Sequence, residues 1–174
     1  MSLSERKSRR EERRFAILLL ALPLGGCFQP LYGEAVHPGL AADMRAIAIA
    51  PIKERIGHYL GDDLLADFNG TGEAPEPKYR LTVTVTVNAA TPTITSQLQT
   101  ANAVTQTAAA TYTLTLAGGG TALLSGTATS VAVNDRTEDR YANLRAQRDG
   151  EIRMAKSLAQ EIELHVAAYL GDKK

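Results

Sequence analysis

Residues Tyr79–Val87 read YRLTVTVTV, and this stretch decides the fold. Every second residue is apolar or aromatic, and the residues between them are Arg or Thr. An alternation with a period of two is typical of a β-strand that buries one face and leaves the other in water. The stretch therefore predicts a strand on the surface of a core, with Val85 among the buried side chains.

Three further runs extend the predicted sheet. Residues 102–116 and 121–133 are rich in Thr, Ala and Val, and Ala117-Gly118-Gly119-Gly120 between them indicates a hairpin turn. Upstream, residues 46–52 (AIAIAPI) form a short apolar run with Pro51 near its end, which suits a strand at an edge or terminus. The sequence therefore predicts one short strand and three longer ones.

Two segments show helical periodicity. From Ile56 to Phe68 the apolar residues recur three or four positions apart, which predicts a helix of about three turns. Residues 138–170 contain no Pro and one Gly, and they predict a long helix interrupted near Gly150. The apolar positions expected on its core face are Tyr141, Leu144, Ile152, Ala155, Ala159, Ile162, Val166 and Tyr169.

The order of strand, helix, three strands and helix gives an α+β fold. We expect a two-layer sandwich in which a small, mostly antiparallel sheet of about four strands is covered on one face by two helices. The predicted organisation is a signal peptide over 1–26, an N-terminal tether over 27–44 and a single domain over 45–171. The 148 residues from position 27 onward are enough to form one core.

Residues 1–26 predict a lipoprotein signal peptide. Six basic side chains precede Phe15–Leu24 (FAILLLALPL), and these ten residues are too few for a membrane span, which needs about 20. Leu24-Gly25-Gly26-Cys27 resembles the lipobox of bacterial lipoproteins, and Cys27 is the only cysteine of the chain. We therefore expect a lipid on Cys27. Phe28 in place of Asp after that cysteine favours the outer membrane.

Composition and motifs argue against several other functions. Removing the first 26 residues leaves 13 basic and 16 acidic side chains, and this mild acidity disfavours nucleic-acid binding. His37, His58 and His165 lack the paired spacing of a metal motif, and a single cysteine excludes a site of several thiolates. We expect no catalysis and no cofactor. The competing hypothesis is an envelope hydrolase that uses His58 with Asp62 or Asp63, although these residues also suit a solvated helix face.

Basic side chains cluster in two places. Lys78 and Arg80 open the predicted strand at 79–87, and six Arg or Lys residues lie between Arg136 and Lys156. Acidic residues are interleaved with them, so the simplest interpretation is a solvated face with ion pairs. The alternative is a site for an anionic headgroup, because Arg offers paired donors that are always charged.

Three features of the chain resemble the LPS-assembly lipoprotein family LptE in its alphaproteobacterial form. Gly26-Cys27-Phe28-Gln29-Pro30-Leu31-Tyr32-Gly33 is similar to the start of the mature proteins of that family, although this chain lacks the Gly that usually follows the cysteine. The order of the elements and the Thr-rich hairpin also resemble the family fold. Residues 141–149 (YANLRAQRD) and 155–161 (AKSLAQE) resemble its last helix.

The resemblance implies a structural role without catalysis. It implies an outer-membrane lipoprotein on the periplasmic side, anchored by acyl chains such as palmitate, that assembles with the β-barrel LptD, plugs it and contacts lipopolysaccharide. Basic residues near the sheet edge would make those contacts, and the candidates are Lys78, Arg80, Arg136 and Arg140. The alternative partner is another envelope lipid-transport system, which the same lipoprotein signal would serve.

Overall fold

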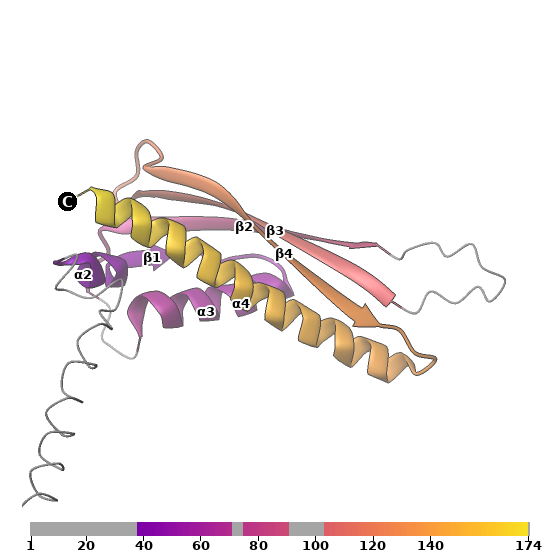
Figure 1. The fold of residues 1–174 in the computed structure, drawn as a ribbon. Helices are drawn as coiled ribbons and strands as arrows, with labels where there is room; N and C mark the ends of the chain where they lie inside the picture. The colour runs from indigo at the N-terminus through magenta and orange to yellow at the C-terminus, as the bar shows by residue number, and fades with distance from the viewer. Residues whose placement is uncertain (1–37, 71–74, 91–102, 174) are drawn as a thin grey trace, which may run out of the picture.

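The computed structural model describes residues 38–70, 75–90 and 103–173 (Figure 1). The predicted signal peptide and Cys27 lie outside the described residues, so they stay predictions. In chain order the elements are α2 (Leu40–Arg45), β1 (Ile47–Ile49), α3 (Arg55–Asn69), β2 (Tyr79–Ala90), β3 (Ala103–Leu116), β4 (Leu124–Asp135) and α4 (Arg140–Asp172).

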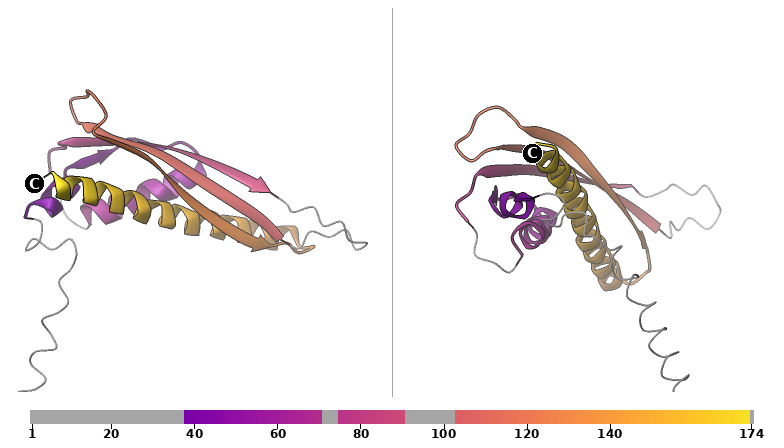
Figure 2. Two further views of the ribbon diagram at one scale, coloured as in Figure 1. Left: turned by 45° about the horizontal axis from the view of Figure 1, so that its top comes forward. Right: turned by 60° about the vertical axis from the view of Figure 1, so that its left-hand side comes forward.

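The four strands form one sheet in the order β1-β2-β3-β4. β1 runs parallel to β2, and the β2–β3 and β3–β4 pairs are antiparallel. The described helices lie on one face of this sheet, and no described element covers its other face (Figure 2). The predicted α+β sandwich with a small, mostly antiparallel sheet is therefore confirmed.

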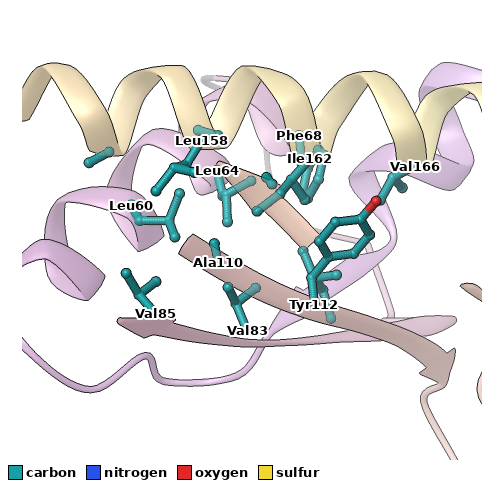
Figure 3. Close-up of a cluster of buried hydrophobic side chains, with 14 of the residues drawn as sticks. Leu60, Leu64, Phe68, Val83, Val85, Ala110, Tyr112, Leu158, Ile162 and Val166 are labelled. Carbon is teal, nitrogen blue, oxygen red and sulfur yellow. The ribbon is translucent and has the colours of Figure 1, made fainter. Parts of the chain in front are cut away.

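The core lies between the sheet and helices α3 and α4 (Figure 3). Val85 is 7% exposed, as its place in the alternating stretch predicted. Burial of each large apolar side chain contributes about 1.5–3 kcal/mol, so this cluster holds the two layers together. The core side chains that Figure 3 labels are Leu60, Leu64, Phe68, Val83, Val85, Ala110, Tyr112, Leu158, Ile162 and Val166.

Helix α2 corrects the predicted tether over 27–44. Residues 40–45 are helical, and the side chains of Leu40 and Met44 are buried against the core. The isolated segment has no long apolar repeat, which is why its sequence suggested a linker. Its helix is stabilised by packing against α3 and α4, which come from distant parts of the sequence.

Helix α4 is continuous through Gly150, so the predicted interruption is wrong. A Cβ atom at this position would lie only 2.8 Å from Asn134 Nδ2, which shows that the helix backbone packs directly onto β4 there. The helix begins after Asp139, whose Oδ1 accepts hydrogen bonds from the backbone N–H groups of Tyr141 and Ala142.

The first four turns of α4 differ in part from the predicted core face. Tyr141, Leu144 and Ile152 are exposed, whereas Ala155, Ala159, Ile162 and Val166 are buried. Val87 at the far end of the alternating stretch is also 38% exposed. Tyr141, Leu144 and Val87 lie beyond the first turn of α3, where the same periodicity continues without a facing layer. Ile152 is exposed because it lies on the outer side of α4, whereas its neighbours Glu151 and Met154 face inward.

Candidate functional site

The structure divides the four predicted lipopolysaccharide-contact residues between opposite ends of the sheet. Arg80 pairs across β2–β3 with Thr115, whereas Arg136 follows Asp135, the residue paired with Ala103 at the other end of β3. At about 3.4 Å per residue, the length of β3 puts about 40 Å between the two positions. The four residues therefore make two separate sites, and one headgroup cannot bridge them.

Lys78 and Arg80 lie at the end of the sheet where β1 pairs with β2. The Lys78 Nζ atom is 3.0 Å from Asp43 Oδ1, so the cation is partly neutralised by helix α2. Arg80 is exposed on the outer face of the sheet. This end presents one paired and one exposed cation.

Arg136 and Arg140 lie at the other end, where β4 leads into α4. Both line a cavity of about 300 Å³ under the first turns of α4. The apolar part of its lining comes from Ala89, Val104 and Leu144. The rest of the lining is polar and includes the carboxylate of Asp135. Two exposed guanidinium groups beside a cavity of mixed lining form the better of the two basic sites for an anionic group with an attached apolar part.

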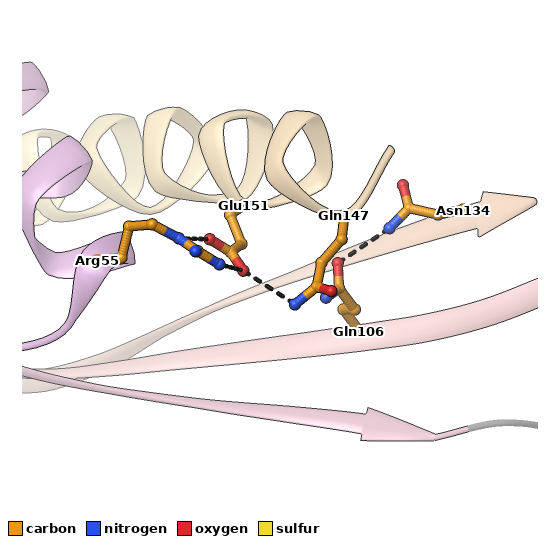
Figure 4. A network of polar contacts seen from close by, with 5 residues as sticks. All are labelled: Arg55, Gln106, Asn134, Gln147 and Glu151. Atoms are coloured by element: carbon orange, nitrogen blue, oxygen red, sulfur yellow. Dashed lines mark hydrogen bonds and ion pairs between the residues drawn. The ribbon is translucent and has the colours of Figure 1, made fainter. Parts of the chain in front are cut away.

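A polar network closes the inner end of this hollow (Figure 4). Arg55 at the start of α3 donates from Nε and Nη2 to the two carboxylate oxygens of Glu151, at 2.8 and 2.7 Å. Glu151 is 6% exposed, and Gln147 Nε2 donates to its Oε1 at 3.3 Å. The hydrogen bond and the charge of Glu151 raise the pKa of Arg55 above its usual value.

A second polar pair joins β3 and β4 beneath the helix. Asn134 Nδ2 donates to Oε1 of the buried Gln106 at 2.9 Å (Figure 4). This bond satisfies a side-chain acceptor that would otherwise be buried at a cost of about 1–3 kcal/mol. The pair explains why α4 needs Gly150 above it, and why the inner sheet face turns polar where the apolar core ends.

A larger cavity of about 760 Å³ lies on the other side of Gln147 and Glu151. It shares Ala89, Gln106 and Gln147 with the smaller cavity, so the two are neighbours under the exposed half of α4. We call the two together the α4 groove. Its remaining walls come from Glu54, Arg55, Ile56 and residues 85–88.

A third cavity of about 260 Å³ lies at the other end of α4, beside α2. Asp67 and Glu163 line it. Burial raises the pKa of both carboxyl groups, and the charge of Asp63 raises that of Asp67 further. The charge of Asp67 in turn adds to the rise in the pKa of Glu163. These two acids therefore oppose folding when both are ionised.

His58 and Asp62 are exposed and make only a long contact. The His58 Nε2 atom is 4.0 Å from Asp62 Oδ2, and the two side chains are 78% and 66% exposed. A shallow hollow of about 310 Å³ adjoins them, but Asp63 does not line it. His165 is on α4, and its Nδ1 atom lies 2.6 Å from the hydroxyl of Tyr112. Burial raises the pKa of Tyr112, and the charge of Glu161 raises it further.

The described part of the chain contains neither a cluster of metal ligands nor a helix that could span a membrane. Within residues 38–70, 75–90 and 103–173, no three His, Cys, Asp or Glu side chains are grouped so that they could bind a metal ion. None of the helices in these ranges has the length and apolarity needed to cross a membrane.

The sequence alone did not reveal the α4 groove. Arg55 and Glu151 are 96 positions apart, and Gln106 and Asn134 are separated by a hairpin. The available signal was the break in hydrophobic pattern, because Gln106 and Glu151 are polar residues at positions that the flanking periodicity assigns to the buried face. Such a break is typical of a buried polar contact but does not identify the partner.

Comparison with known proteins identifies the fold. No known protein family matches the chain by sequence, and neither does any curated protein. A crystal structure of a protein from Caulobacter crescentus, provisionally described as a lipoprotein, matches with a TM-score of 0.63 and 22% identity over 79% of this chain and 98% of its own. At this identity the match shows that the fold is shared.

Two more distant structures also match. One is a minor lipoprotein from Acinetobacter baumannii, with a TM-score of 0.48 and 13% identity over 70% of this chain and 90% of its own. The other is rare lipoprotein B from Shewanella oneidensis, with a TM-score of 0.36 and 10% identity over 73% of this chain and 91% of its own. Neither is close enough to carry an argument.

Proposed function

We propose that this protein is an outer-membrane lipoprotein, anchored through Cys27, that assembles with an LptD-type β-barrel and plugs it during lipopolysaccharide transport. The proposal joins the Leu24–Cys27 motif and the Phe28–Tyr32 segment that follows it to the α+β body. The protein from Caulobacter crescentus that shares the fold is itself described as a lipoprotein, which is in keeping with the anchor.

The observation that carries the proposal is the open outer face of the sheet. Across its middle, Thr84 pairs with Thr111, and Thr111 pairs with Thr127, so a row of hydroxyl groups crosses three strands. Wide β-barrels enclose an aqueous lumen. The exceptions on the β4 part of this face are the exposed Val131 and Val133. A body whose uncovered sheet face is mostly polar can fill such a lumen while leaving little apolar surface against water.

The same body supports a role without catalysis. The best candidate acid–base pair, His58 and Asp62, is exposed, and no third side chain among the described residues holds the imidazole in place. A general base acts efficiently when its orientation is fixed by a partner and its surroundings exclude water. The buried carboxylate of Glu151 is instead bonded to Arg55.

For lipopolysaccharide, we propose Arg136 and Arg140 as the main contacts. They line a cavity that also contains apolar side chains, whereas Lys78 is paired with Asp43. Replacing both arginines with Gln should weaken binding of purified lipopolysaccharide about tenfold or more, because two charge-assisted contacts are lost. The double variant with Gln at positions 78 and 80 is the matched control and should change binding by less than about threefold.

The decisive experiment is affinity purification from detergent-solubilised outer membranes. A C-terminal tag should recover an LptD-type barrel in about equal amounts with the tagged chain, because a plug binds one barrel. An unrelated tagged lipoprotein of similar abundance is the control. Recovery of the chain without any such barrel would contradict the proposal, and recovery of an inner-membrane transporter would favour the other lipid-transport system.

A further inference from the structure

Strand β2 has a long edge that β1 leaves uncovered. β1 pairs only with Tyr79, Arg80 and Leu81, and the backbone N–H of Ala50 donates the last bond, to the carbonyl of Leu81 at 2.9 Å. β2 continues to Ala90. We call the side of residues 83–90 that faces away from β3 the β2 edge. At about 3.4 Å per residue its eight residues extend about 27 Å.

The direction of the backbone groups along this edge follows from the bonds already made. Tyr79 N–H donates toward β1, to Ala46, and the Leu81 carbonyl accepts from that same side. In an antiparallel pair these directions alternate, so the odd-numbered residues face outward and the even-numbered ones bond to β3. Val83, Val85, Val87 and Ala89 each direct one N–H and one C=O outward, and no partner for these groups lies among the described residues.

The opposite edge of the sheet is covered by α4 at one position. The backbone N–H of Thr129 on β4 points away from β3, and Glu161 Oε2 of α4 accepts its hydrogen bond at 3.2 Å. The β2 edge has no such contact, and residues 81–90 (LTVTVTVNAA) contain no charged residue and no proline. Proteins usually block open edges with charges, prolines or covering elements, because an open edge is a template for another strand.

Space is available beside this edge. The 760 Å³ cavity of the α4 groove is lined by residues 85–89 of β2 on one side and by Glu54, Arg55 and Ile56 at the start of α3 on another. An added strand would direct every second side chain toward this cavity and the others toward the open face of the sheet. The cavity walls are mixed, with valines from β2 and polar side chains from α3 and α4.

We propose that the β2 edge binds an extended segment of a partner polypeptide, which adds to the sheet as a fifth strand in line with β1. The segment should be about eight residues long and free of proline at the bonding positions, since its backbone must pair with the outward groups of Val83, Val85, Val87 and Ala89. Small or uncharged polar side chains suit the cavity side, and Thr or Val suits the outer side.

A second copy of this chain is a poorer occupant. Two copies paired antiparallel about the middle of the edge, near Thr86, would bring their α3 first turns toward each other. Glu54 lines the cavity beside that point, so the two-fold symmetry would set Glu54 against its own copy. Like charges in contact disfavour such an interface. A single strand from another protein carries no such symmetric repulsion.

Hydrogen exchange of the purified full chain tests whether the edge is open. The amides of Val85 and Val87 should exchange roughly 100-fold or more faster than those of Thr84 and Thr86, which bond to β3. Equal, slow exchange at all four positions would show that another part of the same chain already pairs with the edge. That result would overturn the proposal.

Site-specific photo-crosslinking in the producing cells tests the occupant. A crosslinking residue placed in turn at Thr84, Thr86 and Asn88, all exposed on the outer face, should join one segment of another polypeptide. The joined position on that segment should move by two residues at each step, as strand pairing requires. Crosslinks to a second copy, to this same chain, to scattered positions or to nothing would each overturn the proposal.

A matched pair of proline variants adds a control. Val87→Pro removes an outward N–H without touching the bonds to β3 and should lower the crosslink yield at Thr86 about tenfold. Val133→Pro removes the equivalent outward N–H on β4 and should leave that yield within about twofold. Equal yields in the two variants would count against the edge. The barrel pull-down is independent, because strand pairing at this edge does not require the partner to be a barrel.

Discussion

Replacing Arg55 tests the polar link between α3 and α4. Arg55 is bonded to Glu151 through two charge-assisted hydrogen bonds of 2.7 and 2.8 Å. The variant Arg55→Met keeps most of the aliphatic length but removes both donors. It leaves the carboxylate of Glu151, which is 6% exposed, with only the 3.3 Å bond from Gln147.

The expected loss in the free energy of unfolding lies between the values for buried and for exposed ion pairs. Removing one partner of a fully buried pair costs about 3–5 kcal/mol, whereas exposed pairs contribute about 0–1 kcal/mol. The Arg55 side chain is 52% exposed, so water can reach the carboxylate once the guanidinium is gone. We therefore expect a loss of about 2 kcal/mol, which lowers the melting temperature by roughly 6 °C for a chain of this size.

Urea unfolding followed by circular dichroism measures this loss in the free energy of unfolding. The double variant with Met at both 55 and 151 is the control, because it leaves no buried charge. It should lose less than about 1 kcal/mol, and so be more stable than Arg55→Met alone. The reasoning is refuted if Arg55→Met unfolds within about 0.5 kcal/mol of the parent, or if the double variant is the less stable of the two.

Three further changes should have distinct effects. Val85→Asp buries an unpaired charge and should prevent folding or lower stability by more than about 3 kcal/mol, whereas Thr84→Asp on the outer face should cost less than about 1 kcal/mol; equal melting temperatures would disprove the assigned faces. Burial raises the pKa of Glu163, so its ionisation lowers the free energy of unfolding as the pH rises through and above the unfolded pKa. Glu163→Gln should therefore raise the melting temperature at pH 7 and not at pH 3. The reverse pattern would be inconsistent with a raised pKa. Tyr112→Phe removes the hydrogen bond to His165 and should lower the free energy of unfolding by about 1 kcal/mol, and an unchanged urea midpoint would show that the bond contributes nothing.

The elements with a regular hydrophobic period could be predicted from sequence. The alternation from Tyr79 to Val85 and the helical spacing from Ile56 to Phe68 are local patterns, and each depends only on which face meets the core. The α+β class followed from the order of these elements. The pattern could not show where the core stops, since Val87 and Leu144 repeat the same period but lie beyond α3 and are exposed.

Features that depend on distant contacts were missed. Helix α2 is held by Leu40 and Met44 packing against elements that follow it, and nothing in its own six residues requires a helix. The four candidate basic residues were also grouped as one set, although they lie at two ends of the sheet. The sequence could not reveal that the length of β3 separates Arg80 from Arg136. The α4 groove arises where the layers diverge, and only the three-dimensional arrangement shows that.

The anchor at Cys27 can be tested by one measurement, the intact mass of the mature protein extracted from its native membrane. We expect the chain to begin at Cys27 and to carry the added mass of a diacylglycerol on sulfur, with or without a further acyl chain on the new amine. A mature chain whose Cys27 is a free thiol would contradict the proposal that this protein is a lipid-anchored component of the outer membrane.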